Sequence, residues 1–455
     1  MSQPPLSALI AELGSDIVTS DPAVMDRYRF DWARDDRAGM PLAVVRAETA
    51  EHVQAAVRWA DRSAVPVVPR GAGSGLSGGS TAVEQCLMIS TERMRAITID
   101  PGARVAIVEP GALNAEVKAA AAEHGLWYPP DPSSFEMCSI GGNLATNAGG
   151  LCCVKYGVTT DYVVGLDVVT ADAKLLKLGG IRVKDVAGLS LMKLFVGSEG
   201  TLGVITRGIL KLVPKQPDTA TLVATFPDVD RAARAVVGMC AEIRPSMLEL
   251  MDGLSINLVE DHLRMGLDRE AGAMLIAQSD SPGAARGLEV SIMERVCTEL
   301  GAKECFVTED PDEGEMFVAA RRAAFQAMEK RGSLLLEDVG AAIPQLPELI
   351  DGVAKIAAEN AIEIPVVAHA GDGNTHPNIV YDPTDPDSVA RAHRAFDQVM
   401  QLAISLGGTI TGEHGVGRLK KSALPEQLGP DVMALSHKIK DALDPKGIMN
   451  PGAVL

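Results

Sequence analysis

Apolar and polar residues recur along this chain with two periods, one typical of helices and one of strands. Residues 6–13 have helical spacing, and so do residues 51–60, which follow Thr49, a residue type that caps helix N-termini. A third helical pattern, residues 113–124, is closed by Gly125. Runs typical of strands cover residues 42–45, 65–68, 87–90, 97–99, 105–108, 162–169, 174–178 and 202–212. Because strands outnumber helices, a mixed α+β domain is predicted.

The pattern changes after residues 214–217, Pro-Lys-Gln-Pro. Strand and helix then alternate: 222–226, 231–242, 273–278, 284–300, 303–308 and 313–330. Alternation of this split βαβ kind predicts a ferredoxin-like second domain.

Length and charge narrow the function. A chain of 455 residues predicts two or three domains. Its formal charge of −18, from 42 basic and 60 acidic residues, argues against a nucleic-acid partner, which would need a basic face. The first residues show no signal-peptide pattern, and no run of residues is long and apolar enough to span a membrane. We therefore expect a cytoplasmic protein, and leave open a peripheral position at the inner face of the membrane.

Two segments are rich in glycine and small polar residues. Residues 69–80 read PRGAGSGLSGGS, and residues 139–150 read SIGGNLATNAGG. Such segments expose backbone N–H groups that suit a pyrophosphate. A single loop of this kind is equally compatible with a flexible connection, but two loops can hold a long cofactor at both ends.

A third pattern surrounds two histidines. Apolar residues 366–368 predict a buried strand that ends at His369, and residues 371–374 predict a turn. On the returning strand, His376 and Asn378 share one face by period-two alternation. Glu413, after a predicted strand at residues 408–411, would complete a two-histidine, one-carboxylate set suited to zinc or another divalent ion. The alternative is a hairpin stabilised by the side chains of Asp372 and Asn374, with no metal.

These motifs carry a family resemblance over nearly the whole chain. The two glycine-rich segments and residues 196–206, VGSEGTLGVIT, resemble the flavin domain of the vanillyl-alcohol-oxidase type FAD enzymes. Residues 369–376 (HAGDGNTH), 412–417 (GEHGVG) and 444–452 (DPKGIMNPG) resemble one branch, the FAD-linked D-2-hydroxyacid dehydrogenases. That branch includes D-lactate dehydrogenase, the FAD subunit of glycolate oxidase and D-2-hydroxyglutarate dehydrogenase.

The resemblance implies an α+β fold in which a two-part FAD-binding domain carries a ferredoxin-like cap. We expect a lead-in at residues 1–40, the FAD-binding domain at 41–215, the cap, or substrate, domain at 216–411, and a segment at 412–455 that returns to the flavin site. The glycine loop contains no histidine, so the FAD is expected to be noncovalent. The residues expected to contact it are Pro69, Arg70, Gly71, Ala72, Gly73, Ser74, Gly75, Leu76, Ser77, Pro132, Ser133, Gly142, Asn143, Thr146, Gly149, Gly150, Glu199, Gly203, Ile205 and Asn450.

The same resemblance assigns the chemistry. It implies that His369, His376 and Glu413 bind the metal and that His414 is the general base. Arg321 is expected to bind the substrate carboxylate, with Asn378 and the two histidines beside the substrate; a solvated Arg321 is the alternative.

One departure bears on the substrate. Relatives that act on hydroxyglutarate carry a hydroxyl residue and a lysine where this chain has Phe325 and Leu336, which leaves no evident cation for a second carboxylate. The sequence thus predicts oxidation of a small D-2-hydroxy acid, similar to D-lactate; D-2-hydroxyglutarate, glycolate or a non-catalytic electron-relay subunit are the alternatives. The acceptor, whether quinone, cytochrome or electron-transfer flavoprotein, and a homodimer are left open.

Overall fold

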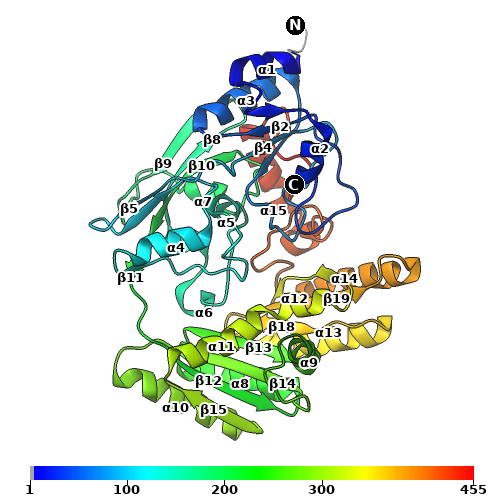
Figure 1. The fold of residues 1–455 in the computed structure, drawn as a ribbon. Coiled ribbons are helices and arrows are strands. Elements are labelled where there is room, and N and C mark those ends of the chain that lie inside the picture. The colour runs from blue at the N-terminus through cyan, green and yellow to red at the C-terminus, as the bar shows by residue number, and fades with distance from the viewer. Residues whose placement is uncertain (1–4) are drawn as a thin grey trace. The chain divides into compact units, whose positions relative to one another are not determined.

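The computed structural model describes residues 5–455, which divide into two compact units. The first unit runs to Gly149 and also holds Val158–Lys215 and Glu413–Leu455. The second holds Gly150–Gly157 and Gln216–Gly412. The chain therefore leaves the first unit twice, and its C-terminal segment, red in Figure 1, belongs to the first unit again.

The first unit contains two main sheets. In one, β2, β4 and β3 are parallel and β1 pairs antiparallel with β2. The other is antiparallel, in the order β5-β6-β10-β8-β9. The strands are β1 (Val18–Thr19), β2 (Ala43–Arg46), β3 (Val67–Arg70), β4 (Leu87–Ser90), β5 (Ile97–Asp100), β6 (Val105–Val108), β7 (Leu126–Trp127), β8 (Val163–Val169), β9 (Leu175–Gly179), β10 (Val204–Lys211) and β11 (Val213–Pro214). The helices are α1 (Leu6–Leu13), α2 (Pro22–Met25), α3 (Ala50–Ser63), α4 (Asn114–Ala122), α5 (Ile140–Thr146), α7 (Met192–Phe195) and α15 (Leu424–Leu443).

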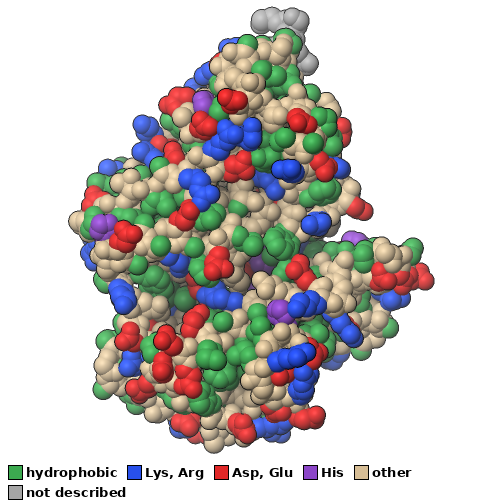
Figure 2. All heavy atoms as spheres, viewed as in Figure 1, with side chains coloured by type: hydrophobic (Ala, Val, Ile, Leu, Met, Phe, Trp, Pro, Cys, Tyr) green, Lys and Arg blue, Asp and Glu red, His purple; other side chains and the backbone are tan. Residues whose placement is uncertain are grey.

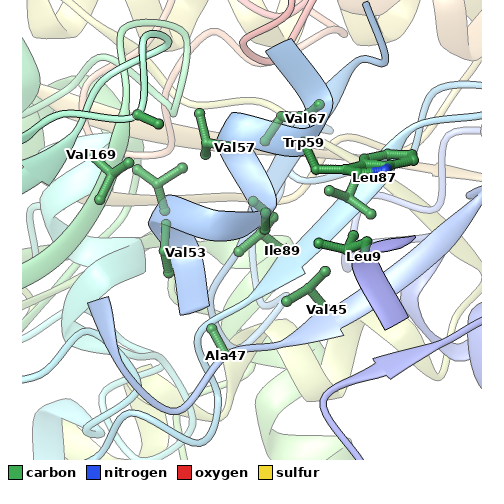
Figure 3. Close-up of a cluster of buried hydrophobic side chains, with 14 of the residues drawn as sticks. Leu9, Val45, Ala47, Val53, Val57, Trp59, Val67, Leu87, Ile89 and Val169 are labelled. Atoms are coloured by element: carbon green, nitrogen blue, oxygen red, sulfur yellow. The ribbon is translucent and has the colours of Figure 1, made fainter. Parts of the chain in front are cut away.

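An apolar core lies between α3 and the strands of the first unit. Thr49 caps α3 by accepting a hydrogen bond from the His52 backbone, and Val53 and Val57 of this helix belong to one apolar cluster with strand residues such as Ile89 and Val169 (Figure 3). Leu9 of α1 belongs to the same cluster, so the N-terminal helix is part of this core. The cluster holds β3 in place, and β3 delivers the first glycine-rich segment from its end.

The second unit is built on one antiparallel sheet in the order β15-β12-β14-β13-β18-β19-β16, with β17 also paired to β19. Both β12 and β13 lie beside β14, and α8 connects them, as in the predicted split βαβ arrangement. The strands are β12 (Ala220–Phe226), β13 (Met247–Asp252), β14 (Ala273–Ser279), β15 (Glu304–Thr308), β16 (Ser333–Leu336), β17 (Val339–Gly340), β18 (Val366–His369) and β19 (Asn374–Tyr381). The helices are α6 (Cys153–Tyr156), α8 (Val229–Glu242), α9 (Gly253–Leu263), α10 (Ala284–Glu299), α11 (Pro311–Arg322), α12 (Ala324–Glu329), α13 (Leu346–Asn360) and α14 (Pro386–Ser405).

Both faces of this sheet are buried, because alternate residues of β13 enter different cores. Leu248 and Leu250 pack with residues of α8, α10 and α13 on one face. Met247 and Met251 pack with residues of α9, α11 and α12 on the other. Glu249 lies between Met247 and Met251 in this alternation, so its side chain points to the face that α11 covers.

The structure confirms the α+β class and corrects two elements. Residues 408–411 are not a strand, because Thr409 makes a single bridge to Gly340 before the chain bends. The helix predicted for residues 313–330 is broken at Ala323 into α11 and α12.

Acidic and basic side chains are intermixed on the face shown in Figure 2. Among residues 5–455, no helix combines the length and apolarity needed to cross a membrane.

Candidate active site

The first glycine-rich segment begins at the end of β3 and approaches the N-terminus of α5. Ser139 caps α5, and its Oγ accepts hydrogen bonds from the backbone N–H of Gly142, at 3.3 Å, and of Ala72, at 3.2 Å. A Cβ at Gly71 would lie 2.4 Å from this Oγ, so only glycine permits the approach. The two segments predicted to form one binding site are thus joined directly within the first unit.

Buried polar atoms at this loop fit a polar ligand. Within the described part of the chain, Arg70 Nη1 and Ser77 Oγ are buried and have no hydrogen-bond partner. Buried polar groups are normally paired, so these two atoms suit a bound molecule that carries phosphate or other hydrogen-bonding oxygens. The loop residues present therefore fit the pyrophosphate region of FAD.

Glu199 and Asn450 tie the loops of the first unit together. Glu199 accepts hydrogen bonds from the backbone N–H groups of Val416, at 2.7 Å, and Gly417, at 2.9 Å. Burial raises the pKa of Glu199 to about 7 although these two bonds act to lower it. Asn450 Nδ2 donates to the carbonyls of Gly79 and Glu199, at 2.8 and 2.7 Å. The C-terminal segment is thereby held against the glycine-rich loop.

The other predicted cofactor residues have more varied surroundings. Asn143 is buried on α5 and accepts a hydrogen bond from Asn114, while Thr146 bonds to the carbonyl of Gly142. Gly203 has no room for a Cβ beside Val168. Among the other predicted residues, Pro132 and Ser133 precede α5, Gly149 follows it and Gly150 belongs to the second unit.

In the second unit, the β18–β19 hairpin brings the two predicted histidines together. The turn has Gly373 at φ +83°, and the backbone N–H of Asn374 donates to Asp372 Oδ1 at 3.0 Å. The rings of His369 and His376 lie 5.0 Å apart, nearly perpendicular, and both side chains are buried. The Asn378 side chain donates to the carbonyl of His376 at 2.7 Å, which fixes the strand beyond the second histidine.

A buried glutamate that sequence reasoning missed lies beside this hairpin. Leu250 is opposite Ala368 in the antiparallel β13–β18 pair, which places Glu249 next to His369. His369 Nδ1 donates to Glu249 at 2.8 and 3.0 Å, and Arg321 on α11 forms an ion pair with the same carboxylate at 2.9 Å. Burial acts to raise the pKa of Glu249, but its interactions with His369, which include a hydrogen bond, and with the Arg321 charge outweigh burial and hold this pKa below its usual value. The signal available in the sequence was an acid at the centre of the apolar run MLELM.

A second buried carboxylate, Asp338, faces His376. Asp338 Oδ1 lies 3.8 Å from His376 Nδ1, and Oδ2 accepts hydrogen bonds from Thr411 Oγ1, at 2.6 Å, and from the Gly412 backbone, at 3.0 Å. Asp338 is fully buried, and its two hydrogen bonds hold it beside the residues that directly precede Glu413.

The structure places the remaining predicted residues as follows. Arg321 is only 4% exposed, so it is not the solvated arginine considered as the alternative. Glu413 and His414 belong to the first unit, where Glu413 Oε1 lies 3.3 Å from His414 Nε2. Phe325 and Leu336 are half-buried, on α12 and β16 of the second unit.

Two family descriptions match the chain. The FAD binding domain matches residues 41–179, and the C-terminal domain of FAD linked oxidases matches residues 215–454. The second match covers more than half of the chain and spans the β18–β19 hairpin.

Full-length relatives agree with these matches. Glycolate oxidase subunit GlcD of Bacillus subtilis is 37% identical over 428 residues, which cover 93% of this chain and 91% of the relative. D-lactate dehydrogenase of Archaeoglobus fulgidus is 33% identical over 440 residues, covering 94% and 96%. Substrate-bound p-cresol methylhydroxylase, at 17% identity, aligns with a TM-score of 0.84 over 99% of this chain and 96% of its own, and this likeness bears on the fold alone.

The fold inferred from the sequence, a vanillyl-alcohol-oxidase type FAD-binding domain with a cap domain, is therefore confirmed. The chain belongs to the FAD-linked oxidases and is a flavin-dependent oxidoreductase.

Proposed function

We propose that this protein oxidises a small D-2-hydroxy acid, similar to D-lactate, to the corresponding 2-oxo acid. The observation that carries the proposal is the grouping of a buried arginine with two histidines in the second unit. A guanidinium binds a carboxylate bidentately, and an alcohol must lose a proton before it gives up a hydride. The names of the two relatives, one for glycolate and one for D-lactate, support the same substrate class.

Arg321 would orient the substrate through its carboxylate. The ion pair with Glu249 fixes the guanidinium, and a guanidinium has five N–H donors in a rigid plane. A fixed carboxylate would turn the α-carbon and its hydroxyl toward one direction, which lowers the entropic cost of reaching the transition state.

His369, His376 and Glu413 would hold a divalent metal, and His414 would take the hydroxyl proton. Two imidazoles and a carboxylate are ligands that suit zinc and other first-row divalent ions. Bound FAD would accept the hydride, and the metal would lower the pKa of the hydroxyl. Asn378 donates to the backbone carbonyl of His376, which holds the strand that carries this imidazole.

The metal proposal is tested with His376→Ala. Turnover should fall steeply while the flavin spectrum is retained, because the site predicted for FAD lies in the first unit. Full activity in exhaustively chelated protein, with no metal found by elemental analysis, would show the proposal to be wrong.

The substrate proposal is tested by steady-state kinetics with an artificial acceptor. Phe325 and Leu336 offer apolar contact, worth about 25 cal/mol per Å² buried, in place of a second cation. D-lactate or D-2-hydroxybutyrate should therefore exceed D-2-hydroxyglutarate in kcat/KM by at least about tenfold, or about 1.4 kcal/mol of transition-state discrimination. A preference for D-2-hydroxyglutarate would contradict this choice and point to Lys330 or Arg331 as the missing cation.

A further inference from the structure

Glu249 is a charged residue at a position where the surrounding apolar cores would favour an apolar side chain. It is 1% exposed, in the centre of β13, among residues that otherwise form two apolar cores. A buried carboxylate costs several kcal/mol in desolvation unless it is paired and hydrogen-bonded. Both of its oxygens are used, toward His369 and Arg321, which are the two groups proposed above for metal and substrate carboxylate.

The contact with His369 fixes which ring nitrogen carries the proton. A carboxylate only accepts hydrogen bonds, so Nδ1 of His369 must be the donor at 2.8 and 3.0 Å. Glu249 and Arg321 together are electrically neutral, so a neutral imidazole adds no net charge to this buried group. In the neutral ring, the lone pair then lies on Nε2.

We propose that Glu249 is a positioning residue that sets the ligand nitrogen of His369 and the guanidinium plane of Arg321 at the same time. This inference rests on the proposed role of His369 as a metal ligand. A carboxylate behind a histidine ligand orients the ring and raises its basicity, and loss of such a partner typically weakens metal affinity by about 10- to 100-fold. One carboxylate thus links the metal ligand to the substrate-binding cation.

The first test needs no metal and no turnover. In metal-free, FAD-loaded protein labelled with ¹⁵N-histidine, the signal of His369, identified by its loss in His369→Asn, should show a proton on Nδ1 and a lone pair on Nε2. In Glu249→Gln this preference should be lost or reversed. Protonated Nε2 in the wild type, or no change in Glu249→Gln, would overturn the proposal.

The second test measures affinity for zinc by competition with a chelator. Glu249→Gln should bind zinc about 10- to 100-fold more weakly than the wild type, and Glu249→Asp, which keeps the charge, should recover part of the loss. Glu260→Gln is the matched control, because Glu260 is also a buried glutamate of the second unit but binds the backbone of residues 265–267. Equal zinc affinity in Glu249→Gln and Glu260→Gln would overturn the proposal.

The two tests separate this inference from the proposed function. If the wild type bound no zinc, the metal part of the proposed function would fail, while the His369 proton measurement would still decide whether Glu249 sets the tautomer. If Glu249→Gln does not fold, the wild-type spectrum and Glu249→Asp decide the question.

Discussion

At the scale of single residues, two buried glutamates bind different kinds of partner. Glu199 in the first unit binds backbone N–H groups, whereas Glu249 in the second binds side chains that carry chemistry. Sequence reasoning found the histidines because they flank a recognisable turn. It missed Glu249, because the contact depends on the pairing of β13 with β18, which are separated by more than a hundred residues.

Glu199 should make stability depend on pH. Its pKa is about 7 in the folded protein against an ordinary value of 4.5, so the folded state binds this proton more tightly than the unfolded chain does. The contribution of Glu199 is therefore fully present below pH 4.5, is lost as the pH rises to 7, and amounts to roughly 3 kcal/mol. Denaturant titrations of wild type and Glu199→Gln from pH 4.5 to 8 should show the difference; parallel curves would contradict the assignment.

His414→Ala should separate proton removal from cofactor binding. Loss of a general base typically slows a reaction by about 10²- to 10⁴-fold. Stopped-flow flavin reduction should slow by this factor while the flavin absorbance stays unchanged. Unaltered reduction would remove His414 from the mechanism.

At the scale of elements, the sequence predicted the bounds of helices and strands best where these bounds depend on neighbouring residues alone. The helix at residues 6–13 and the strands at residues 87–90 and 105–108 have the predicted bounds, and Thr49 caps α3. The exceptions depend on distant partners. Residues 408–411 were predicted as a strand, but Asp338 binds the Thr411 hydroxyl and the Gly412 backbone, and the chain bends at this segment.

The approach of the glycine-rich loop to α5 should be sensitive to one methyl group. In Gly71→Ala, the new Cβ would lie 2.4 Å from Ser139 Oγ, so the loop or the helix cap must move. We expect weaker FAD retention, measured by flavin content after gel filtration. Gly287→Ala on α10 is the control, because a Cβ there meets nothing within 4 Å and alanine favours a helix. Equal flavin content in the two variants would contradict the role of this contact.

At the scale of the whole molecule, composition and the order of the motifs predicted the fold class and the family. The points at which the chain passes from one unit to the other did not follow from local patterns. Residues 150–157 lie between two segments of the first unit in sequence but belong to the second. Leu151 is buried in its core, and Lys155 and Tyr156 both bind the buried Asp280. The domain bounds expected from the sequence do not assign residues 150–157 to the second domain, and these bounds stay a prediction.

Residues 150–157 should stabilise the second unit. A fragment of residues 216–412 lacks Leu151, and loss of a buried leucine side chain typically costs about 2–5 kcal/mol. Its thermal midpoint, followed by circular dichroism, should be lower than that of the same fragment with residues 150–157 fused ahead of it. Equal midpoints would show that the segment contributes nothing to this unit.

The central claim is that this flavoprotein takes a hydride from a small D-2-hydroxy acid. The most direct measurement is anaerobic mixing of the FAD-loaded protein with D- and L-lactate, D-2-hydroxybutyrate, glycolate and D-2-hydroxyglutarate while the flavin absorbance is followed. We predict rapid bleaching with D-lactate or D-2-hydroxybutyrate and much slower bleaching with L-lactate and D-2-hydroxyglutarate. An oxidised flavin that persists with every one of these acids would contradict the account.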